Sequence, residues 1–504
     1  MKITESIVVV LYFAVCVAIG LYYHKRSTNS MDEFYTAGGN VGLSANTLAT
    51  FAAFASGGST IGGVGFAYSF GVPFTWASVL GSIQGFILAS FLVAPTLRKM
   101  KIRTISDFFK LRYQWKTITV VSGFIVLIAF TVYLVSQYKA GAITAQFLLG
   151  WDYKAALFLM ALVYIIYVSI GGMWAITMTD AFQAAIMLIA MISLGIISVV
   201  QYGGIPSLLS NVLEAAPTWG KNNVPPISLI GFAFLWATTV VCMPHIVMRA
   251  LSAKNIKVAR QSFSFAALVY GLMVVIGFVG VSGAAMIMFP PGTDQALMDS
   301  DMALLGVMQE LFPPVMQGVA AAGIMAAIMS TTASLLLAIS AAISNDILGN
   351  LMPNATDKFL LTMGNVSIWV FGFLTAVLAL DPPALLALLY SNAIGVLTAG
   401  FFWPLVLGVW WKKANKYGAL ASMLVGSGLY ILIAGIEWMG LIKLPLFSTF
   451  LIVFPIAFIV NIIVSVTTSN SKRDNKGLEL MDNIHTGKTY TNESSDISAA
   501  SIQV

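Results

Sequence analysis

Runs of about 20 apolar residues recur along most of this 504-residue chain. An α-helix of that length spans the roughly 30 Å hydrocarbon core of a bilayer. Only 9% of the residues are charged and 59% are hydrophobic, which excludes an ordinary soluble or disordered chain. The runs lie at about 4–23, 42–70, 73–96, 118–148, 154–172, 174–202, 227–244, 261–289, 313–347, 359–380, 383–411, 417–438 and 445–468. The sequence therefore predicts an all-α integral membrane protein with about 13 transmembrane helices.

The basic residues fall on alternate connections between these runs. Of the 26 Lys and Arg residues, 21 lie in one set of connections, which includes the C-terminal segment, and four lie in the opposite set. Cytoplasmic loops carry an excess of Lys and Arg. We therefore expect a multi-pass protein of the cell membrane, surrounded by the lipid bilayer, with its N-terminus outside and its C-terminus in the cytoplasm. The net charge of +6 then reflects membrane topology and not binding to nucleic acid.

The remaining composition argues against an enzyme. Cys16 and Cys242 both lie inside apolar runs, so we expect neither a disulfide nor a metal framework. The chain has three histidines, one of them near the C-terminus, and no paired carboxylates inside the apolar runs. No cofactor and no obligate protein partner are indicated. Residues 1–468 are predicted to form the transmembrane domain, and the polar segment 469–504 a disordered cytoplasmic tail.

Two of the apolar runs are interrupted by residues that weaken a membrane helix. The second contains "AAFASGGSTIGGVGFAYSFG" (52–71), and the seventh carries Thr238 and Thr239 and ends at Pro244. Each opens a group of five runs, so the second group starts from the opposite side of the membrane. Paired broken helices in two inverted halves point to the midplane binding site of a secondary transporter. The alternative for the glycines is a close packing face between two intact helices.

The ninth run carries a polar face. Ala327, Ser330 and Thr331 lie one turn apart on the same side of a helix. Two hydroxyls together with backbone carbonyls would form a neutral oxygen cluster, which suits a hard, weakly held monovalent cation such as Na⁺. The alternative is that both hydroxyls bond back to carbonyls one turn earlier in their own helix.

Five segments of the chain carry a resemblance to a known family. They are "GGSTIGGVGFAYSFG" (57–71), "GGMWAITMTDAFQAAIMLI" (171–189), "MPHIVMRAL" (243–251), "MAAIMSTTASLLLAISAAISNDI" (325–347) and "FWPLVLGVWWKKANKYGALASMLVG" (402–426). On these segments the chain resembles the sodium:solute symporter family, and within it the sodium/pantothenate symporter branch. The resemblance covers about residues 5–465. It implies the amino-acid/sodium symporter-like fold, with inverted five-helix repeats at about 42–202 and 227–411 and extra helices at 4–23, 417–438 and 445–468.

The resemblance also implies positions for the coupling ion. Carried over from the family, the sodium ligands would be the backbone carbonyls of Ala52, Ala55 and Ala327 and the hydroxyls of Ser330 and Thr331. An acidic residue of the family matches Asp180. An ionisable residue inside the membrane is a functional hypothesis by default, so we assign Asp180 to the exit path of the ion, with a structural cap as the alternative.

Two residues depart from the pattern. Proline-transporting relatives have an Asp beside the cation ligands of the broken helix, where this chain has Phe54, which argues against proline as the substrate. Lys139 is the one basic residue that the predicted spans leave in mid-membrane. Burying its ammonium group is costly unless it is paired. Three interpretations stay open: a counter-charge for a substrate carboxylate, a partner for a protein carboxylate, and a residue that extends to the outer surface.

Other substrate contacts follow from position in the broken helices and in the eleventh run. Together with Lys139, the candidate substrate-binding residues are Ser56, Gly57, Ser59, Trp236, Thr239 and Asn392, with Ser391 beside the last; ordinary interhelical hydrogen bonding is the alternative for each. We expect a symporter that imports a small organic anion together with Na⁺, with pantothenate as the expected anion. The alternatives are proline or an acetate-like monocarboxylate within the family, and a cation channel or solute sensor outside it.

Overall fold

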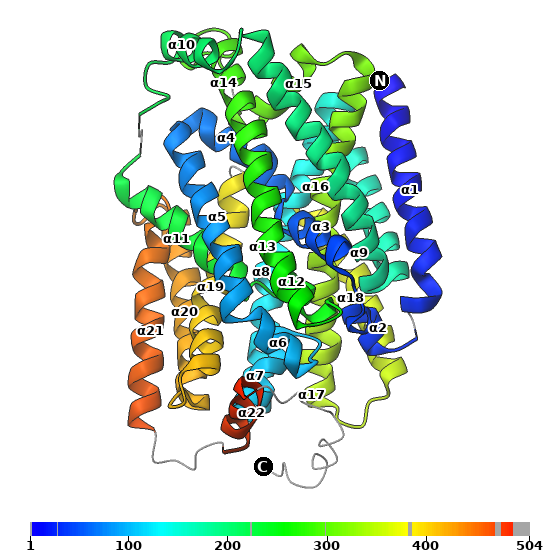
Figure 1. Cartoon of the computed structure of the whole chain (residues 1–504), viewed down its shortest axis with the longest axis vertical. Helices are drawn as coiled ribbons and strands as arrows, with labels where there is room; N and C mark the ends of the chain where they lie inside the picture. Colours follow the sequence, from blue (N-terminus) through cyan, green and yellow to red (C-terminus); the bar gives the residue numbers. More distant parts are fainter. Residues whose placement is uncertain are drawn as a thin grey trace.

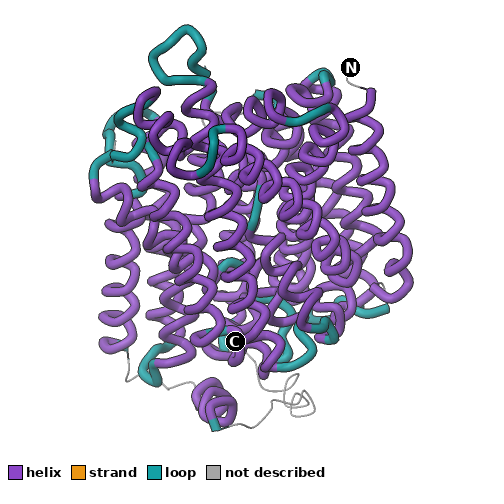
Figure 2. Tube along the Cα trace, turned by 45° about the horizontal axis from the view of Figure 1, so that its top comes forward, coloured by secondary structure: helices purple, strands orange, loops and turns teal. Residues whose placement is uncertain are grey.

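The computed structural model describes residues 3–27, 29–221, 224–297, 299–381, 386–468 and 475–486. In this part of the chain the regular structure is helical (Figure 2). Ten of the described helices are long and apolar enough to cross a membrane, and a pair of shorter helices bent by 42° makes an eleventh span. The structure therefore bears out the all-α membrane architecture.

The long helices pack side by side along the vertical axis of Figure 1. They are α1 (Ile3–Ser27), α5 (Val72–Leu92), α8 (Lys116–Thr144), α9 (Tyr153–Gln201), α13 (Ile256–Met273) with α14 (Val279–Met288), α16 (Pro314–Ala341), α18 (Asp357–Leu378), α19 (Leu386–Trp410), α20 (Lys416–Trp438) and α21 (Ser448–Thr467). Short π-helical turns extend α8 to Leu149 and α16 to Leu348, and join α13 to α14. The helix α16 is the most enclosed, since its most apolar stretch is fully buried, and it forms the centre of the bundle.

Two interruptions of the chain decide how the thirteen predicted runs map onto the helices. The helix α9 has 49 residues, more than twice the length of a span, and it is kinked at Gly172, where φ is 52° and ψ is −164°. These angles are not helical, so Gly172 divides Tyr153–Gln201 into two spans at the boundary between the predicted runs 154–172 and 174–202. The second predicted run is divided into α3 (Leu43–Phe54) and α4 (Gly57–Phe70), and each half is too short to cross the membrane alone.

The break between α3 and α4 is built by its own residues. Ala55 and Ser56 have extended backbones, with ψ of 91° and 169°. Ser56 and Ser59 form a reciprocal capping box, in which each side chain accepts a hydrogen bond from the other's backbone N–H. This motif satisfies donors at the start of a new helix, so the chain leaves α3 and starts α4 within two residues.

The second broken span lies where the sequence predicts it. The helix α11 (Pro226–Cys242) ends two residues before Pro244, and α12 (Pro244–Ser252) continues after Met243 and the 42° bend. The chain beside the two broken spans is joined by a short parallel bridge. The N–H of Val41 donates to the Ser252 carbonyl at 3.0 Å, and the N–H of Lys254 donates to the Val41 carbonyl at 2.8 Å. The start of α3 and the end of α12 are therefore held together.

Shorter helices cover the two ends of the bundle. They are α2 (Met31–Thr36), α6 (Ala94–Met100), α7 (Ile105–Tyr113), α10 (Ile205–Ala215), α15 (Ala303–Leu311), α17 (Gly349–Leu351) and α22 (Asn475–His485). The helices α6, α7 and α22 lie at the lower end in Figure 1, opposite to the start of α1.

The helix α22 departs from the predicted disordered tail. Gly477, Leu480, Met481 and Ile484 are buried and follow helical spacing, so an amphipathic face holds residues 475–485 against the bundle. Residues 469–474 and 487–504 of that prediction lie outside the described part of the chain.

Candidate functional site

The break between α3 and α4 faces the polar side of α16. The hydroxyl of Ser330 lies 2.9 Å from the Ala52 carbonyl oxygen and 3.2 Å from that of Ala327. The hydroxyl of Thr331 lies 3.4 Å from the carbonyl of Ala53. All five of these residues of α3 and α16 are buried. The structure thus brings together four of the five predicted sodium ligands, and Ala55, the fifth, lies at the break itself.

The break is what releases these carbonyls from helical hydrogen bonding. In a continuous helix, Ala52 and Ala53 would accept from the N–H groups of residues 56 and 57. Here the N–H of Ser56 donates to Ser59 Oγ at 2.8 Å, and the N–H of Gly57 donates to Gln137 Oε1 at 3.1 Å. The carbonyls are therefore turned toward α16 and its hydroxyls.

This donor set fits a monovalent cation. The contributing atoms are neutral carbonyl and hydroxyl oxygens, which hard cations prefer. Ser330 also shows the expected alternative, a bond back into its own helix, so its hydroxyl bridges α16 and α3. The Ser330 hydroxyl and the carbonyl oxygens of Ala52 and Ala327 therefore lie close together between α3 and α16.

A buried ion pair lies one helical turn further along α16. Arg249 Nη2 of α12 is 2.6 Å from Asp180 Oδ2 of α9, and both side chains are fully buried. The same nitrogen donates to Ser334 Oγ at 2.5 Å, and Nη1 donates to Thr177 Oγ1 at 3.1 Å. Ser334 follows Ser330 by four residues, so it lies on the same helix face. The Asp180–Arg249 pair therefore connects α9, α12 and α16 at a point one helical turn from Ser330.

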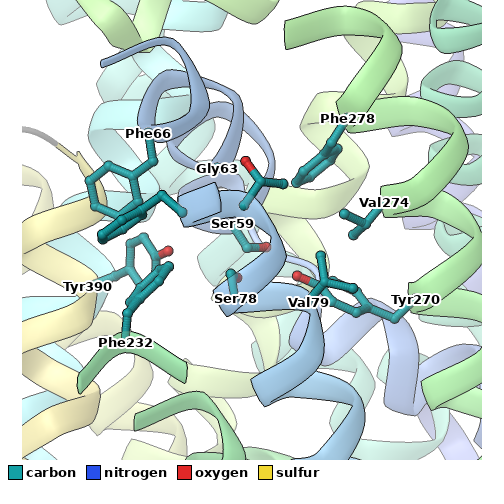
Figure 3. A pocket seen from close by; sticks show the side chains of 12 residues that line it. Ser59, Gly63, Phe66, Ser78, Val79, Phe232, Tyr270, Val274, Phe278 and Tyr390 are labelled. Carbon is teal, nitrogen blue, oxygen red and sulfur yellow. The ribbon is translucent and has the colours of Figure 1, made fainter. Parts of the chain in front are cut away.

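On the other side of the break, the structure contains a narrow cavity (Figure 3). It is lined by twelve uncharged residues of α4, α5, α11, α13, α19 and the π-helical turn after α13: Ser59, Gly63, Phe66, Phe74, Thr75, Ser78, Val79, Phe232, Tyr270, Val274, Phe278 and Tyr390. The space that the centre of a water molecule can reach is about 10 Å³, room for one water. A larger solute requires the aromatic side chains to move apart.

Two glycines of α4 let aromatic rings reach this cavity. A Cβ at Gly58 would overlap the Tyr390 ring, and a Cβ at Gly63 would lie 2.9 Å from Phe278 Cε2. Gly57 is crowded as well, since a Cβ there would lie 2.6 Å from Ile328 Cγ1. Glycines in this stretch therefore serve close approach to α16, α19 and the turn after α13.

The predicted substrate contacts divide into three groups. Ser59 lines the cavity, while Ser56 and Gly57 lie at the break and already have hydrogen-bond partners within the protein. Trp236 is buried beside Tyr390, with ring centroids 5.8 Å apart, and its indole N–H has no hydrogen-bond partner among the described residues.

Three further predictions lie away from the cavity. Thr239 pairs with Thr398 of α19 at 3.0 Å. Asn392 is exposed and accepts from Tyr430 of α20 at 3.4 Å, so the structure does not bring it to the cavity. Lys139 is half-buried on α8 and is not one of the twelve lining residues.

Phe54 takes part in an aromatic cluster. Its ring centroid is 4.9 Å from that of Phe86, 5.1 Å from that of Trp236 and 4.9 Å from that of Tyr270. The position next to the candidate cation ligands is therefore filled by packed rings and not by a carboxylate.

Sequence reasoning missed three residues of this region. Gln137 accepts the hydrogen bond of Gly57, Tyr390 packs on Gly58, and Ser334 joins the buried ion pair. Ser334 could have been found, because it continues the Ser330 face by one turn. Gln137 and Tyr390 are single residues on distant helices, and nothing in their local sequence links them to the glycines.

Comparison with known proteins identifies the family of this chain. A model of the sodium:solute symporter family matches residues 34–426. The chain belongs to the sodium:solute symporter family. The symporter is 30% identical over 447 residues to sodium/proline symporter 2 of Staphylococcus saprophyticus and 31% identical over 448 residues to the sodium/proline symporter of Staphylococcus aureus, with 86% of each chain covered in both comparisons. These relatives do not support the pantothenate branch.

Solved structures share the fold of this symporter. A Na⁺-coupled sialic acid symporter in a substrate-bound, outward-open state superposes with a TM-score of 0.73 at 20% identity, covering 92% of this chain and 97% of that one. MhsT in complex with L-phenylalanine superposes with a TM-score of 0.53 at 14% identity, covering 84% of this chain and 98% of that one. The expected fold of inverted repeats is confirmed, and the protein is a sodium-coupled solute symporter of the membrane rather than an enzyme.

Proposed function

We propose that this symporter imports a small organic carboxylate with a compact apolar part, coupled to Na⁺. The observation that carries the proposal is the position of the aromatic cavity directly beside the α3–α4 break, where Ser330 meets the Ala52 carbonyl. The ion would bind the carbonyls of Ala52, Ala55 and Ala327 with the two α16 hydroxyls. The solute would place its apolar part among the rings and its carboxylate toward the start of α4, where the helix dipole favours an anion.

Phe54 supports an anionic solute without an amine. The ammonium group of an amino acid needs a buried acceptor or counter-charge, and the rings around Phe54 offer neither a carboxylate nor an amide. Pantothenate and short monocarboxylates meet this condition. Proline is the second candidate, favoured by the names of the relatives at 30–31% identity.

The transport cycle follows from the two sides of the break. With the N-terminus outside, the cavity beside α4 would open to the exterior and the Asp180–Arg249 pair would close the route to the cytoplasm. Ion exit would require Arg249 to release Asp180 and Ser334. By linkage, ion and solute must each favour the binding of the other by the same coupling free energy.

Uptake into proteoliposomes tests the proposal. Labelled pantothenate, isobutyrate, acetate and proline are each offered with and without an inward Na⁺ gradient. We expect gradient-dependent accumulation of at least one of the carboxylates that lack an amine. Accumulation of proline alone would overturn the substrate class, and absence of any Na⁺-dependent uptake would overturn the coupling.

A further inference from the structure

The helix α22 (Asn475–His485) lies against the lower end of the bundle, outside the region that the family model matches. It contacts α6 and α7, which connect the spans α5 and α8 (Figure 1). Leu480, Met481 and Ile484 are 8%, 4% and 1% exposed, so its apolar face is as enclosed as the interior of the bundle.

The backbones of α22 and α7 approach closely at one point. A Cβ at Gly477 would overlap the carbonyl oxygen of Arg112. Only a glycine permits this approach, so any larger residue at position 477 would push α22 away from α7.

Polar contacts hold the C-terminal half of α22. Lys99 of α6 donates to the Ile484 carbonyl at 2.7 Å. This carbonyl lies in the last turn of α22, where a positive charge stabilises the helix dipole. Lys412 lies 2.8 Å from Asp482, and the Trp410 and His485 rings stack with centroids 5.2 Å apart. Trp410 is the last residue of α19 and Lys412 follows it by two residues, so α22 is bound to α6, α7 and the end of α19 at once.

These elements belong to different halves of the transporter. The helices α6 and α7 connect spans of the first repeat, and α19 is the last helix of the second. Arg112 strengthens the same junction, because its buried guanidinium donates to the carbonyls of Gly408 at 2.7 Å and Ala414 at 3.1 Å. A movement of one repeat against the other must strain or break the α22 contacts.

We propose that α22 is a latch that stabilises the conformation in which the Asp180–Arg249 pair is closed, and that its release favours opening of that end. The proposal rests on the proposed transport cycle. A segment that binds one conformation and not the other shifts the equilibrium toward the conformation it binds. Release of α22 then lowers the fraction of transporters that are available to solute on the outer side.

Two variants of the full chain test the latch. Gly477→Val removes the close approach to Arg112, and Leu480→Asp combined with Ile484→Asp places charges on the buried face. The reporter is Cys242, which is fully buried at the joint between α11 and α12, in a Cys16→Ala background. We expect both variants to raise the rate of Cys242 labelling by a membrane-permeant maleimide at least threefold, and to raise the external KM for solute.

Glu479→Gln is the matched control, because Glu479 is on the exposed face of the same helix. It should label at the wild-type rate. Wild-type labelling in both test variants would overturn the latch. Because labelling requires no transport, a symporter that fails to accumulate solute but still labels faster in both variants would refute the proposed function and leave the latch standing.

Discussion

The buried Asp180–Arg249 pair permits a quantitative prediction. Both side chains are fully buried and 2.6 Å apart, and Arg249 also donates to Ser334 and Thr177. Removing one partner of such a pair leaves an uncompensated buried charge, at a cost of about 3–5 kcal/mol. We therefore expect Arg249→Met to lower the free energy of unfolding by about 3 kcal/mol and to reduce Na⁺-driven uptake at least tenfold.

Asp180→Asn should be the more damaging single variant. A carboxylate left alone can take up a proton, whereas a guanidinium stays charged in proteins. We expect a loss of about 4–5 kcal/mol for Asp180→Asn, at the upper end of the range for a broken buried pair. The double variant removes both charges, so we expect it to regain at least about 2 kcal/mol over Asp180→Asn, since exchanging a whole buried pair for neutral groups is often close to neutral.

The assay is unfolding in mixed micelles with increasing SDS, followed by tryptophan fluorescence, with uptake measured on the same preparations. The three variants and the wild type form a double-mutant cycle. If the losses in the free energy of unfolding are additive, or if each single variant loses less than about 1 kcal/mol, the two charges do not depend on one another. Recovered stability without recovered uptake would indicate that Arg249 acts in opening as well as in packing.

Three further outcomes are expected. Ser330→Ala should raise the Na⁺ concentration for half-maximal uptake about tenfold, the worth of a hydrogen bond to a charged group, whereas Thr332→Val should not, because Thr332 bonds back to Ile328 at 2.7 Å within α16. Gly58→Ala should abolish uptake by displacing Tyr390. Gly428 on α20 has open space beside it, so Gly428→Ala should leave uptake unchanged in the same assay. Lys139→Met should retain uptake within twofold, since Lys139 does not line the cavity; a selective loss of anion uptake would show that it provides the counter-charge.

Sequence reasoning correctly predicted the features of this protein that depend on a local sequence pattern. The apolar runs, the break in the glycine-rich stretch and the break before Pro244 follow from chain length and backbone chemistry, and the structure has all three. Gly172 adds a fourth such feature, because its φ of 52° and ψ of −164° are not helical and fall at the boundary between the predicted runs 154–172 and 174–202.

The residues that line the cavity were harder to predict from the sequence. Asn392 looked polar within an apolar run, yet its side chain faces α20, while Tyr390 two residues earlier reaches the cavity. A shift of two residues turns a side chain by about 200° around a helix, so small errors in the assumed face exchange a lining residue for an outward one. The helix α22 was missed for a different reason: its i, i+3, i+4, i+7 pattern is short and mixed with charges.

The hydrogen bond from Ser330 to the Ala52 carbonyl has a consequence for the contact between α3 and α16. A buried carbonyl without a partner costs about 1–3 kcal/mol. The Ser330 hydroxyl reaches the carbonyl of Ala52 and the Thr331 hydroxyl reaches that of Ala53, so two carbonyls that the break frees from helical hydrogen bonding find partners on α16. A change in the distance between α3 and α16 therefore exposes both carbonyls at once. The energy of that separation depends on which group takes the place of the hydroxyls.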